Sequence, residues 1–522
     1  MKTITKIILS NFKRFKQFQL DLDPKLNILI GDNEAGKSSV LVALDLILSG
    51  SRSKVETLGL ETLFNIDVVD SFLNGTKKIE NLPTLFVEVY LSAQNDPVLN
   101  GKYNSTDTTC DGLRFECVPI EEYSKEISEI LSGNQPNFPF EYYSIKFVTF
   151  SGESYTGYRK YLKHLLIDGS QVSNEYATRE YTKSIYASHA TVLDRNKHEN
   201  EYRMSKGQFR LKALAEMNDK LDEYKFSVRT SAKSNLETDL IITEGDIPIE
   251  HKGKGRQCFI KTEFALRKNN SEHRLDALLL EEPENHLSHT NMKKLIQRIS
   301  ESENKQLFIA THNSLISTRL GLLQAIILNS GTEKSIYLKS LPPDTAKFFM
   351  KAPDNNILEF VLSKKVILVE GDAEFILLDA LYKNHSADSL LEKEGVHVIS
   401  VGGTSFKRYL DLAMLLDIKT AVLRDNDKNY VVNCVDNYTD YKSNNIKVFS
   451  DSDDARYTFE VCLYQDNRAA CDDLFLPGRR TITPQEYMLG NKAEAAFELL
   501  DKKGTVLVAP KYIQDAIKWI KE

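Results

Sequence analysis

Near the start of the chain, the residues best suited to chemistry are a lysine and a serine that directly follow the second of two glycines. Gly31–Ser38 reads Gly-x-x-x-x-Gly-Lys-Ser and follows the apolar stretch Leu26–Ile30. Glycine permits backbone angles that other residues resist, so the amides of such a loop can turn toward phosphate oxygens. Lys37 can then reach the β- and γ-phosphates of a nucleotide, and the Ser38 hydroxyl can bind Mg2+. The residues that we assign to this nucleotide site are Asn33, Gly36, Lys37, Ser38 and Ser39.

Carboxylates that could act on the same nucleotide follow a second apolar run. Leu278–Glu284 reads Leu-Leu-Leu-Glu-Glu-Pro-Glu. We predict that Glu281 lies in the shell of the metal ion and that Glu282 polarises the attacking water. An acidic pair after a strand is weak evidence alone and gains weight from the phosphate loop. His312 follows a third apolar run and is predicted to hydrogen-bond the γ-phosphate, although a single histidine is more often structural.

A second set of acids lies in the last third of the chain. Glu370 ends the apolar run Val366–Val369, and Glu374 follows one helical turn later. Asp425 and Asp427 end another such run, where alternate residues project to the same side. Like charges so close repel, so either a divalent cation neutralises them or some are protonated. Oxygen ligands favour Mg2+ or Mn2+ over zinc. The alternative is that these acids are solvated loop residues.

Alternating strands and helices are predicted to position this second set of acids. Such alternation indicates a parallel sheet, and ligands gather at the carboxyl ends of parallel strands. The stretch 348–357 that precedes the region reads as a linker. The predicted strands are 365–369, 396–401 and 420–423, and the predicted helices are 373–382 and 406–416.

The phosphate loop needs a strand before it and a helix after it, and the sequence predicts both, at 26–30 and 40–48. Residues 11–15 read as the cap of the first strand, and 95–112 as a loop. Lys252–Gln257 precedes a predicted helix that ends at Leu266. The remaining predicted strands are 3–9, 18–22, 84–92, 145–150, 239–242, 275–280 and 306–310, with a further helix at 291–300.

A region of different character separates the phosphate loop from the later acids of the same site. From Tyr158 to Tyr224 the chain is charged and mostly helical, beginning at Tyr158–Leu166, and apolar residues recur near helical spacing. One interpretation is a helix pair packed on the nucleotide-binding domain. The interpretation that we favour is an inserted dimerisation module. The recurring residues are Phe209, Leu211, Leu214, Met217 and Leu221.

Size and composition indicate a soluble chain of several domains. The chain has 522 residues, of which 41% are hydrophobic and 27% charged, and its net charge is -7. Nucleic-acid binding would therefore need local basic patches or metal ions. The 6 cysteines form no Cys-x-x-Cys pair, which disfavours zinc and a disulfide framework. With no signal peptide and no apolar run of about 18 residues, we expect a reduced, cytoplasmic setting.

The N-terminal motifs resemble those of ABC-type ATPases of the SMC/RecF kind, and most of all the ATPase half of OLD-family proteins. The resemblance rests on Asn11–Phe15, Glu281–Glu284 and Thr311–Asn313. It implies that two heads sandwich ATP, with a signature loop of one subunit on the γ-phosphate of the other. Gly253, Gly255 and Gln257 stand where that signature falls. The usual Ser-Gly-Gly is replaced by Lys-Gly-Lys-Gly, and Glu281 replaces an aspartate, which favours a slow, gating ATPase.

The C-terminal acids resemble those of the Toprim domain of topoisomerases, primases and OLD nucleases. The resemblance implies that Glu370 is the invariant acid, that Asp425 and Asp427 form its Asp-x-Asp pair, and that Glu374 is the extra acid of the OLD branch. It also implies that Glu460 is a further metal ligand and that Lys492 is the lysine that stabilises charge on the scissile phosphate. A surface lysine remains the alternative for the last assignment.

The resemblance implies an α/β protein with an SMC-like P-loop ATPase and a Toprim domain with a Rossmann-like parallel sheet. Two divalent cations ~3.5–4 Å apart could then hydrolyse a phosphodiester. The first hypothesis is an ATP-regulated DNA endonuclease in anti-phage defence, with Glu282, His312, Lys492, Glu370 and Asp425 as catalytic residues. The second is a DNA-binding clamp or repair scaffold with inactive Toprim acids. The predicted domains are 1–157 and 231–355 for the ATPase, 158–230 for the dimerisation insertion and 356–522 for the Toprim domain.

Several partners follow from these hypotheses. DNA is the expected substrate, and ATP with Mg2+ or Mn2+ are the expected cofactors. We expect a homodimer or a larger even assembly, and the family suggests a defence partner protein or retron nucleic acid. Basic residues that could contact DNA phosphates, or that could merely keep the surface soluble, are Lys407, Arg408, Arg479 and Arg480.

Overall fold

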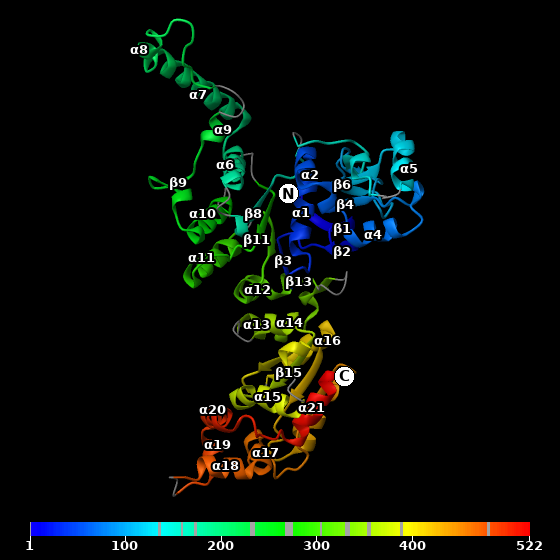
Figure 1. Cartoon of the computed structure of the whole chain (residues 1–522), viewed down its shortest axis with the longest axis vertical. Coiled ribbons are helices and arrows are strands. Elements are labelled where there is room, and N and C mark those ends of the chain that lie inside the picture. The colour runs from blue at the N-terminus through cyan, green and yellow to red at the C-terminus, as the bar shows by residue number, and fades with distance from the viewer. Residues whose placement is uncertain are drawn as a thin grey trace. The chain divides into compact units, whose positions relative to one another are not determined.

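The structure is a computed structural model that describes residues 2–133, 137–157, 160–171, 175–229, 235–266, 275–302, 305–328, 335–351, 356–386, 390–403, 405–477 and 481–522. Contacts within the chain divide it into two compact units. The first comprises Met1–Leu320 with Gln324–Ser335, and the second comprises Gly321–Leu323 with Ile336–Glu522. Figure 1 shows the elements of each unit along the chain.

An antiparallel sheet forms one layer of the first unit. Its strand order is β2-β1-β4-β6-β5, and β7 also pairs with β6. In β2 the buried and exposed residues nearly alternate, as expected of an edge strand with one solvated face. The strands are β1 (Ile4–Phe12), β2 (Phe15–Asp21), β4 (Leu85–Leu91), β5 (Asn100–Gly101), β6 (Cys110–Pro119) and β7 (Tyr143–Thr149).

A parallel sheet forms the second layer and carries the phosphate loop. Its neighbouring strands run in the order β13-β3-β12-β11-β8, and each is an almost continuous buried run, which is typical of parallel strands covered on both faces. Helix α1 (Lys37–Ser49) contacts strands of both sheets and is therefore packed between them. The strands are β3 (Leu26–Gly31), β8 (His164–Asp168), β11 (Ala277–Glu281), β12 (Gln306–Ala310) and β13 (Ala325–Leu328). Strand β14 (Ser335–Tyr337) begins at the last residue of the first unit.

Further helices and two short strands complete the first unit. Helices α6, α10, α11 and α12 supply buried residues to one apolar cluster with the parallel strands. The elements are α2 (Arg52–Leu58), α3 (Leu60–Leu63), α4 (Ile66–Asn74), α5 (Ser124–Ser132), α6 (Glu175–His189), α7 (Val192–Lys212), α8 (Ala215–Asn218), α9 (Leu236–Asp239), β9 (Thr243–Glu244), β10 (Ile247–Pro248), α10 (Lys254–Leu266), α11 (His289–Ser300) and α12 (Ser314–Gly321).

Among the described residues, the segment that follows β7 becomes helical after β8. The prediction of a helical start at Tyr158–Leu166 is wrong for its described residues, because His164–Asp168 is a strand that pairs in parallel with β11. Tyr158 and Arg159 lie outside the described residues. Long-range pairing with an apolar neighbour overrides the local charged composition there. Helix α7 follows, capped by Thr191 and Asp194, and it has no buried residue. Its apolar residues Phe209 and Leu211 are 55% and 68% exposed.

Three other local predictions need correction. Residues 239–242 are not a strand, because α9 reaches Asp239 and is held by a capping box at Asn235. The loop predicted at 95–112 contains β5 and the start of β6, which pair with each other. The linker prediction at 348–357 is wrong for its first residues, because Phe349 is fully buried in helix α13 (Pro343–Lys351). Residues 352–355 lie outside the described residues.

The second unit contains a parallel sheet, as the alternating pattern predicted, with a fourth strand, β18, in addition to the three predicted ones. The order is β16-β15-β17-β18. The strands are β15 (Lys365–Val369), β16 (Val396–Ser400), β17 (Lys419–Leu423) and β18 (Ile446–Phe449). The helices are α14 (Ile357–Leu362), α15 (Asp372–His385), α16 (Phe406–Leu416), α17 (Phe459–Asp466), α18 (Arg468–Phe475), α19 (Pro484–Gly490), α20 (Lys492–Lys503) and α21 (Lys511–Lys521).

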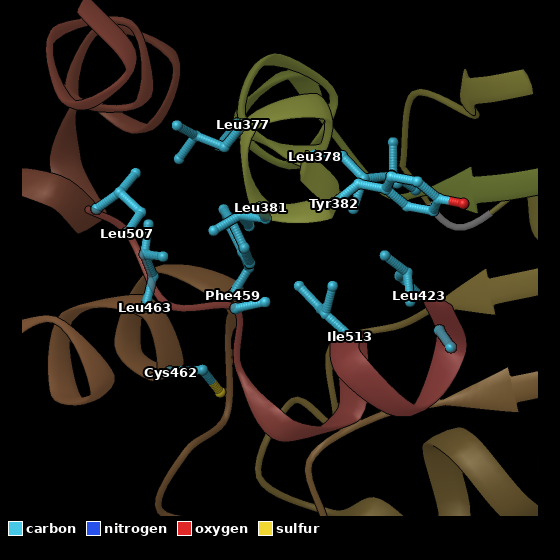
Figure 2. Packing of buried hydrophobic residues seen from close by; sticks show 14 of the residues in the cluster. Leu377, Leu378, Leu381, Tyr382, Leu423, Phe459, Cys462, Leu463, Leu507 and Ile513 are labelled. Carbon is cyan, nitrogen blue, oxygen red and sulfur yellow. The ribbon is translucent and has the colours of Figure 1, made fainter. Parts of the chain in front are cut away.

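One apolar cluster joins α15, α17, α18, α19, α20 and α21 to the sheet. Figure 2 shows leucines of α15 facing Phe459 and Leu463 of α17 and Ile513 of α21. Leu377 and Leu381 are fully buried there, and complete burial of such a side chain contributes roughly 2 kcal/mol. The cluster fixes α15 and α17, the two helices whose first turns carry Glu374 and Glu460.

Within the described part of the chain, no helix combines the length and apolar character needed to cross a bilayer. The six cysteines all lie among the described residues, and none of them forms a disulfide.

Candidate active sites

The phosphate loop of the first unit needs its glycines for steric reasons. Gly36 has a φ of 97°, in the left-handed region that favours glycine. A Cβ at this position would overlap the ring of Phe15, and a Cβ at Gly31 would overlap the carbonyl oxygen of Leu328. The turn between β3 and α1 can therefore form only because both positions lack a side chain.

A pocket of about 580 Å³ opens at this loop. It brings together eight residues that the sequence assigned to the nucleotide, from the phosphate loop, the end of β11 and the end of β12. The lining residues are Arg14, Asp32, Asn33, Glu34, Gly36, Lys37, Ser38, Ser39, Glu281, Glu282, Asn285 and His312.

Lys37 is held in place by the loop itself. Its Nζ donates to the carbonyl oxygens of Gly31 at 2.8 Å and Asp32 at 3.1 Å, and it lies 2.9 Å from Nε2 of His312. Burial lowers the pKa of Lys37, although the surrounding carboxylates favour its charged form. The ammonium is thus already positioned beside the space that a nucleotide phosphate would fill.

Glu282 and His312 face each other in the same pocket. Nε2 of His312 lies 3.2 Å from Oε1 of Glu282. Burial, followed by repulsion from Glu284, raises the pKa of Glu282 to about 8. Burial and the nearby ammonium of Lys37 lower the pKa of His312. A carboxyl group with a pKa close to neutrality can accept a proton from water, which is the role predicted for Glu282.

Glu281 and Ser38 form the predicted magnesium ligands of this pocket. The Ser38 hydroxyl hydrogen-bonds to the Glu281 carboxylate, while burial raises the pKa of Glu281. Both groups offer oxygen, so the pair fits Mg2+ in donor chemistry. Bound there, Mg2+ would neutralise charge on the nucleotide phosphates.

Glu284 was not assigned from the sequence, although it belongs to this site. Its carboxylate accepts hydrogen bonds from the Thr311 hydroxyl and from the backbone N–H of His312 at 3.2 Å. This contact fixes the turn that presents His312. The signal available in the sequence was the third acid of Glu-Glu-Pro-Glu, which directly follows the proline.

The predicted signature residues do not line the pocket of their own chain. Gly255 lies against the carbonyl oxygen of His286, which a Cβ would overlap. Gln257 Nε2 donates to the carbonyl oxygens of Glu250 at 3.2 Å and Lys252 at 2.8 Å. The contact of Gly253 and Gly255 with ATP of a second subunit stays a prediction.

In the second unit, acids gather at the carboxyl ends of β15 and β17. Glu370 follows β15 directly, and Asp425 follows β17 by two residues. Oδ1 of Asp425 accepts a hydrogen bond from the N–H of Phe459 at 2.8 Å, which ties β17 to the start of α17. Asp425 is 8% exposed and Glu460 3% exposed. Parallel pairing of β15 with β17 sets the two strand ends side by side.

The acids are close enough to perturb one another. Burial, followed by repulsion from Glu374, Glu370 and Glu460, raises the pKa of Asp425 to about 8. Burial and repulsion from Glu460 and Glu370 raise the pKa of Glu374 to about 7. The structure therefore brings together four of the five predicted metal ligands.

Lys492 lies at this cluster, as the sequence predicted. Its Nζ is 3.1 Å from Oε2 of Glu460. Burial opposes its charged form, but Glu460, Asp425 and Glu374 together raise the pKa of Lys492. A protonated lysine beside the acids could stabilise charge on a bound phosphate.

Asp427 is the fifth predicted ligand, and it does not converge with Asp425. Its backbone is left-handed, with a φ of 49°, and its Oδ2 accepts a hydrogen bond from Nη2 of Arg424 at 2.7 Å. Nη1 of the same arginine donates to Glu370. Arg424 was missed, although an arginine at the end of an apolar strand and next to an aspartate is a visible signal.

The donor chemistry of this cluster fits a divalent cation. All its potential ligands are carboxylates, and Oε2 of Glu460 is buried with Nζ of Lys492 as its neighbour at 3.1 Å. Among the residues that the structure describes, however, no three His, Cys, Asp or Glu side chains are already arranged around one ion position. Binding of Mg2+ or Mn2+ at Glu370, Glu374, Asp425 and Glu460 would require side-chain movements, because Glu370 is paired with Arg424. The ion would activate water and neutralise a phosphodiester.

Two of the basic residues proposed for phosphate contact hydrogen-bond to neighbours within the second unit. Lys407 donates to Asn437 at 3.1 Å, and Arg408 donates to the hydroxyl of Thr345 at 2.9 Å. Arg479 and Arg480 lie outside the described residues.

Two protein-family models match the chain. The model described as AAA ATPase domain matches residues 1–316. The model described as Overcoming lysogenization defect protein-like, TOPRIM domain matches residues 361–427. No curated protein matches the chain by sequence.

Solved structures also share similarity with parts of the chain. The C-terminal region of the OLD protein of Xanthomonas campestris pv. campestris is 22% identical with a TM-score of 0.23, covering 30% of this chain and 94% of that one. An Smc head domain derived from Pyrococcus furiosus is 12% identical with a TM-score of 0.34, covering 67% and 100%. The recombination mediator protein RecF with ATP is 12% identical with a TM-score of 0.34, covering 64% and 99%.

Proposed function

Because the chain belongs to the OLD family of ATPase–Toprim proteins, with an AAA ATPase domain over residues 1–316 and an OLD-like TOPRIM domain over 361–427, we propose that it is an ATP-regulated, divalent-metal-dependent DNA endonuclease. The observation that carries the nuclease proposal is the cluster of Glu370, Glu374, Asp425 and Glu460 with Lys492 at the carboxyl edge of a parallel sheet.

The ATPase half supplies the regulatory input. Lys37 binds the β- and γ-phosphates, and Ser38 with Glu281 holds the magnesium ion that accompanies the nucleotide. Glu282 takes a proton from the attacking water, since its raised pKa matches neutral conditions. Nε2 of His312 lies 2.9 Å from Nζ of Lys37, and from this position His312 orients the γ-phosphate. Hydrolysis then changes how two heads associate, and that change controls cleavage.

The Toprim half carries out phosphodiester hydrolysis. Glu370, Glu374, Asp425 and Glu460 would hold divalent cations, which would supply an activated water and neutralise the scissile phosphate. Asp425 is kept in place by the N–H of Phe459, and Glu374 by the first turn of α15. Lys492 stabilises the negative charge that develops on the phosphate, because its carboxylate neighbours keep it protonated. Hydrolysis needs no tyrosine nucleophile.

The test is metal-dependent cleavage of plasmid DNA by the full-length chain, with and without ATP. We expect Asp425→Asn to reduce the cleavage rate by about 10²-fold or more, since it removes a charge from the cluster. The matched control is Asp473→Asn, an exposed aspartate of the same unit that pairs with Lys503 and should leave cleavage unchanged. Full cleavage by Asp425→Asn, or equal loss in both variants, would refute the nuclease site.

A second candidate function is a DNA-binding clamp or repair scaffold of the SMC/RecF kind with inactive Toprim acids. The observation that favours it is the ion pairing of Glu370 and Asp427 with Arg424, which occupies two of the predicted metal ligands. This function predicts ATP-dependent DNA binding without cleavage in Mg2+ or Mn2+. DNA retention and cleavage measured on the same samples separate the two functions.

We also propose a homodimer or larger even assembly in which the helical insertion supplies a contact between subunits. The exposed apolar residues of α7 support this, because a helix with no buried residue has an unpaired apolar surface. Light scattering at micromolar concentration with ATP tests it, and a monomer there would contradict the proposal. The biological role that we propose is cytoplasmic defence against phage, with a partner protein or retron nucleic acid as its trigger.

A further inference from the structure

A buried arginine lies among the acids of the second unit. The Arg424 side chain is 8% exposed, and the residue directly follows β17. Nη1 donates to Oε2 of Glu370, and Nη2 donates to Oδ2 of Asp427. A single guanidinium therefore bridges two of the five acids that we assign to metal binding.

The two bridged carboxylates are ones that an ion from solution can reach. Glu370 is 24% exposed at its side chain and Asp427 49%. They follow β15 and β17, which pair in parallel, so the guanidinium spans the gap between two neighbouring strand ends. A planar guanidinium with its N–H groups in a fixed fork binds two carboxylates well and neutralises the same charges that a metal ion would.

The remaining acids are not bridged by a cation in the same way, because among the described residues Lys492 forms an ion pair with Glu460 alone. Asp425 and Glu374 are both buried, and the charge of Glu374 repels that of Asp425. Oε2 of Glu460 lies 3.1 Å from Nζ of Lys492 and has no other partner. Buried carboxylates with spare oxygens are costly unless a cation binds them. This side of the cluster is therefore the more favourable position for an incoming ion.

We propose that Arg424 occupies one of two cation positions in this site and competes with a divalent cation for Glu370 and Asp427. The proposal rests on the proposed nuclease function and adds an order of binding. A first ion enters among Glu374, Asp425 and Glu460. A second ion binds only when the guanidinium of Arg424 leaves Glu370 and Asp427. The second ion is consequently weaker, and the site is complete only at a higher metal concentration.

The experiment is a titration of the nucleotide-free, full-length chain with Mn2+, followed by the electron paramagnetic resonance signal of the free ion and by calorimetry. In the wild type we expect two ions at the Toprim site whose dissociation constants differ by at least about tenfold. In Arg424→Gln the weaker ion should bind about tenfold or more tightly, equivalent to ~1.4 kcal/mol, while the tighter ion changes little. Arg424→Lys should give a smaller tightening, because an ammonium cannot bridge both carboxylates.

Three controls make the result specific. Arg456→Gln removes another arginine of this unit that bridges two carboxylates, Asp451 and Asp466, and should alter neither ion. Glu281→Gln identifies ions of the ATPase pocket, because it should remove any ion bound there and leave the two Toprim dissociation constants unchanged. Retention of the tighter ion reports an intact site, and if Arg424→Gln does not fold, Arg424→Lys carries the test.

Equal affinity of two ions in the wild type, or no tightening in either Arg424 variant, would overturn the competition. So would binding of no ion at all. These outcomes differ from failure of the proposed function. If two ions bind in the predicted order but DNA is not cleaved, the nuclease function is refuted and the competition by Arg424 is supported. If DNA is cleaved and the two ions bind with equal affinity, the nuclease function is supported and the competition is refuted.

Discussion

The two candidate sites both lie at the carboxyl edge of a parallel sheet, but they are prepared for their ligands differently. The ATPase pocket is open, and its cation, Lys37, is held by carbonyl oxygens of its own loop. In the Toprim cluster the buried cation, Arg424, binds the acids themselves. The first site can therefore accept a ligand without breaking an ion pair, whereas the second must exchange one cation for another.

The largest expected effect concerns Lys37. Lys37→Ala should reduce ATP hydrolysis by about 10³-fold, because it removes the charge that stabilises the γ-phosphate in the transition state. Release of inorganic phosphate measures this. If the two sites act independently, ATP-independent DNA nicking should persist. The control is Lys16→Ala, an exposed lysine paired with Asp67, which should change neither activity.

A smaller effect is expected at Lys492. Lys492→Ala should slow DNA cleavage by about 10²-fold and leave ATP hydrolysis without DNA unchanged, because the lysine stabilises charge only at the scissile phosphate. Lys503→Ala is the matched control, since Lys503 is on the same helix and pairs with Asp473 outside the cluster. Unchanged cleavage in Lys492→Ala would mean that the lysine only neutralises Glu460.

The smallest effect concerns the stability of the unit that carries the ATPase pocket. Asp45 on α1 is buried, yet hydrogen bonds from His164 of β8 and the charge of Lys54 lower its pKa to about 2. The folded state thus gains stability from the ionised group above about pH 4, and the gain is lost as the pH falls toward 2. Its size is on the order of 2 kcal/mol.

This contribution is measured from the denaturant-induced unfolding transition of the unit that carries the ATPase pocket. Asp45→Asn should lower the free energy of unfolding at pH 7, and the difference from the wild type should shrink at pH 3 and below. Asp67→Asn, at an exposed ion pair, should show no such dependence. If the difference in free energy of unfolding between Asp45→Asn and the wild type does not change with pH, the loss of stability comes from packing rather than from ionisation.

Contiguous motifs were predictable because their chemistry depends on neighbours in the sequence. The phosphate loop is of this kind, and so are Gln306–Ala310, Lys365–Val369 and Phe406–Leu416, whose bounds agree with the structure. Strand β8 could not be predicted in the same way. It is five residues long within a charged region, and its pairing partner β11 lies far along the chain.

The partners of Arg424 illustrate the same limit at the level of side chains. Asp427 is three residues away and could have been inferred, but Glu370 belongs to another strand. The sequence placed acids at two strand ends and therefore predicted a cluster. It could not show which carboxylates would be neutralised by the chain itself, because that depends on how β15 and β17 pair.

The closeness of Phe15 to Gly36 has a consequence for variation in sequence. The aromatic ring occupies the volume that a side chain at position 36 would need. Two positions that are 21 residues apart in the sequence (36 − 15) thus share one small space. A side chain at position 36 would also need a left-handed φ of 97°, so reducing the bulk of Phe15 should not restore function to a Gly36→Ala variant.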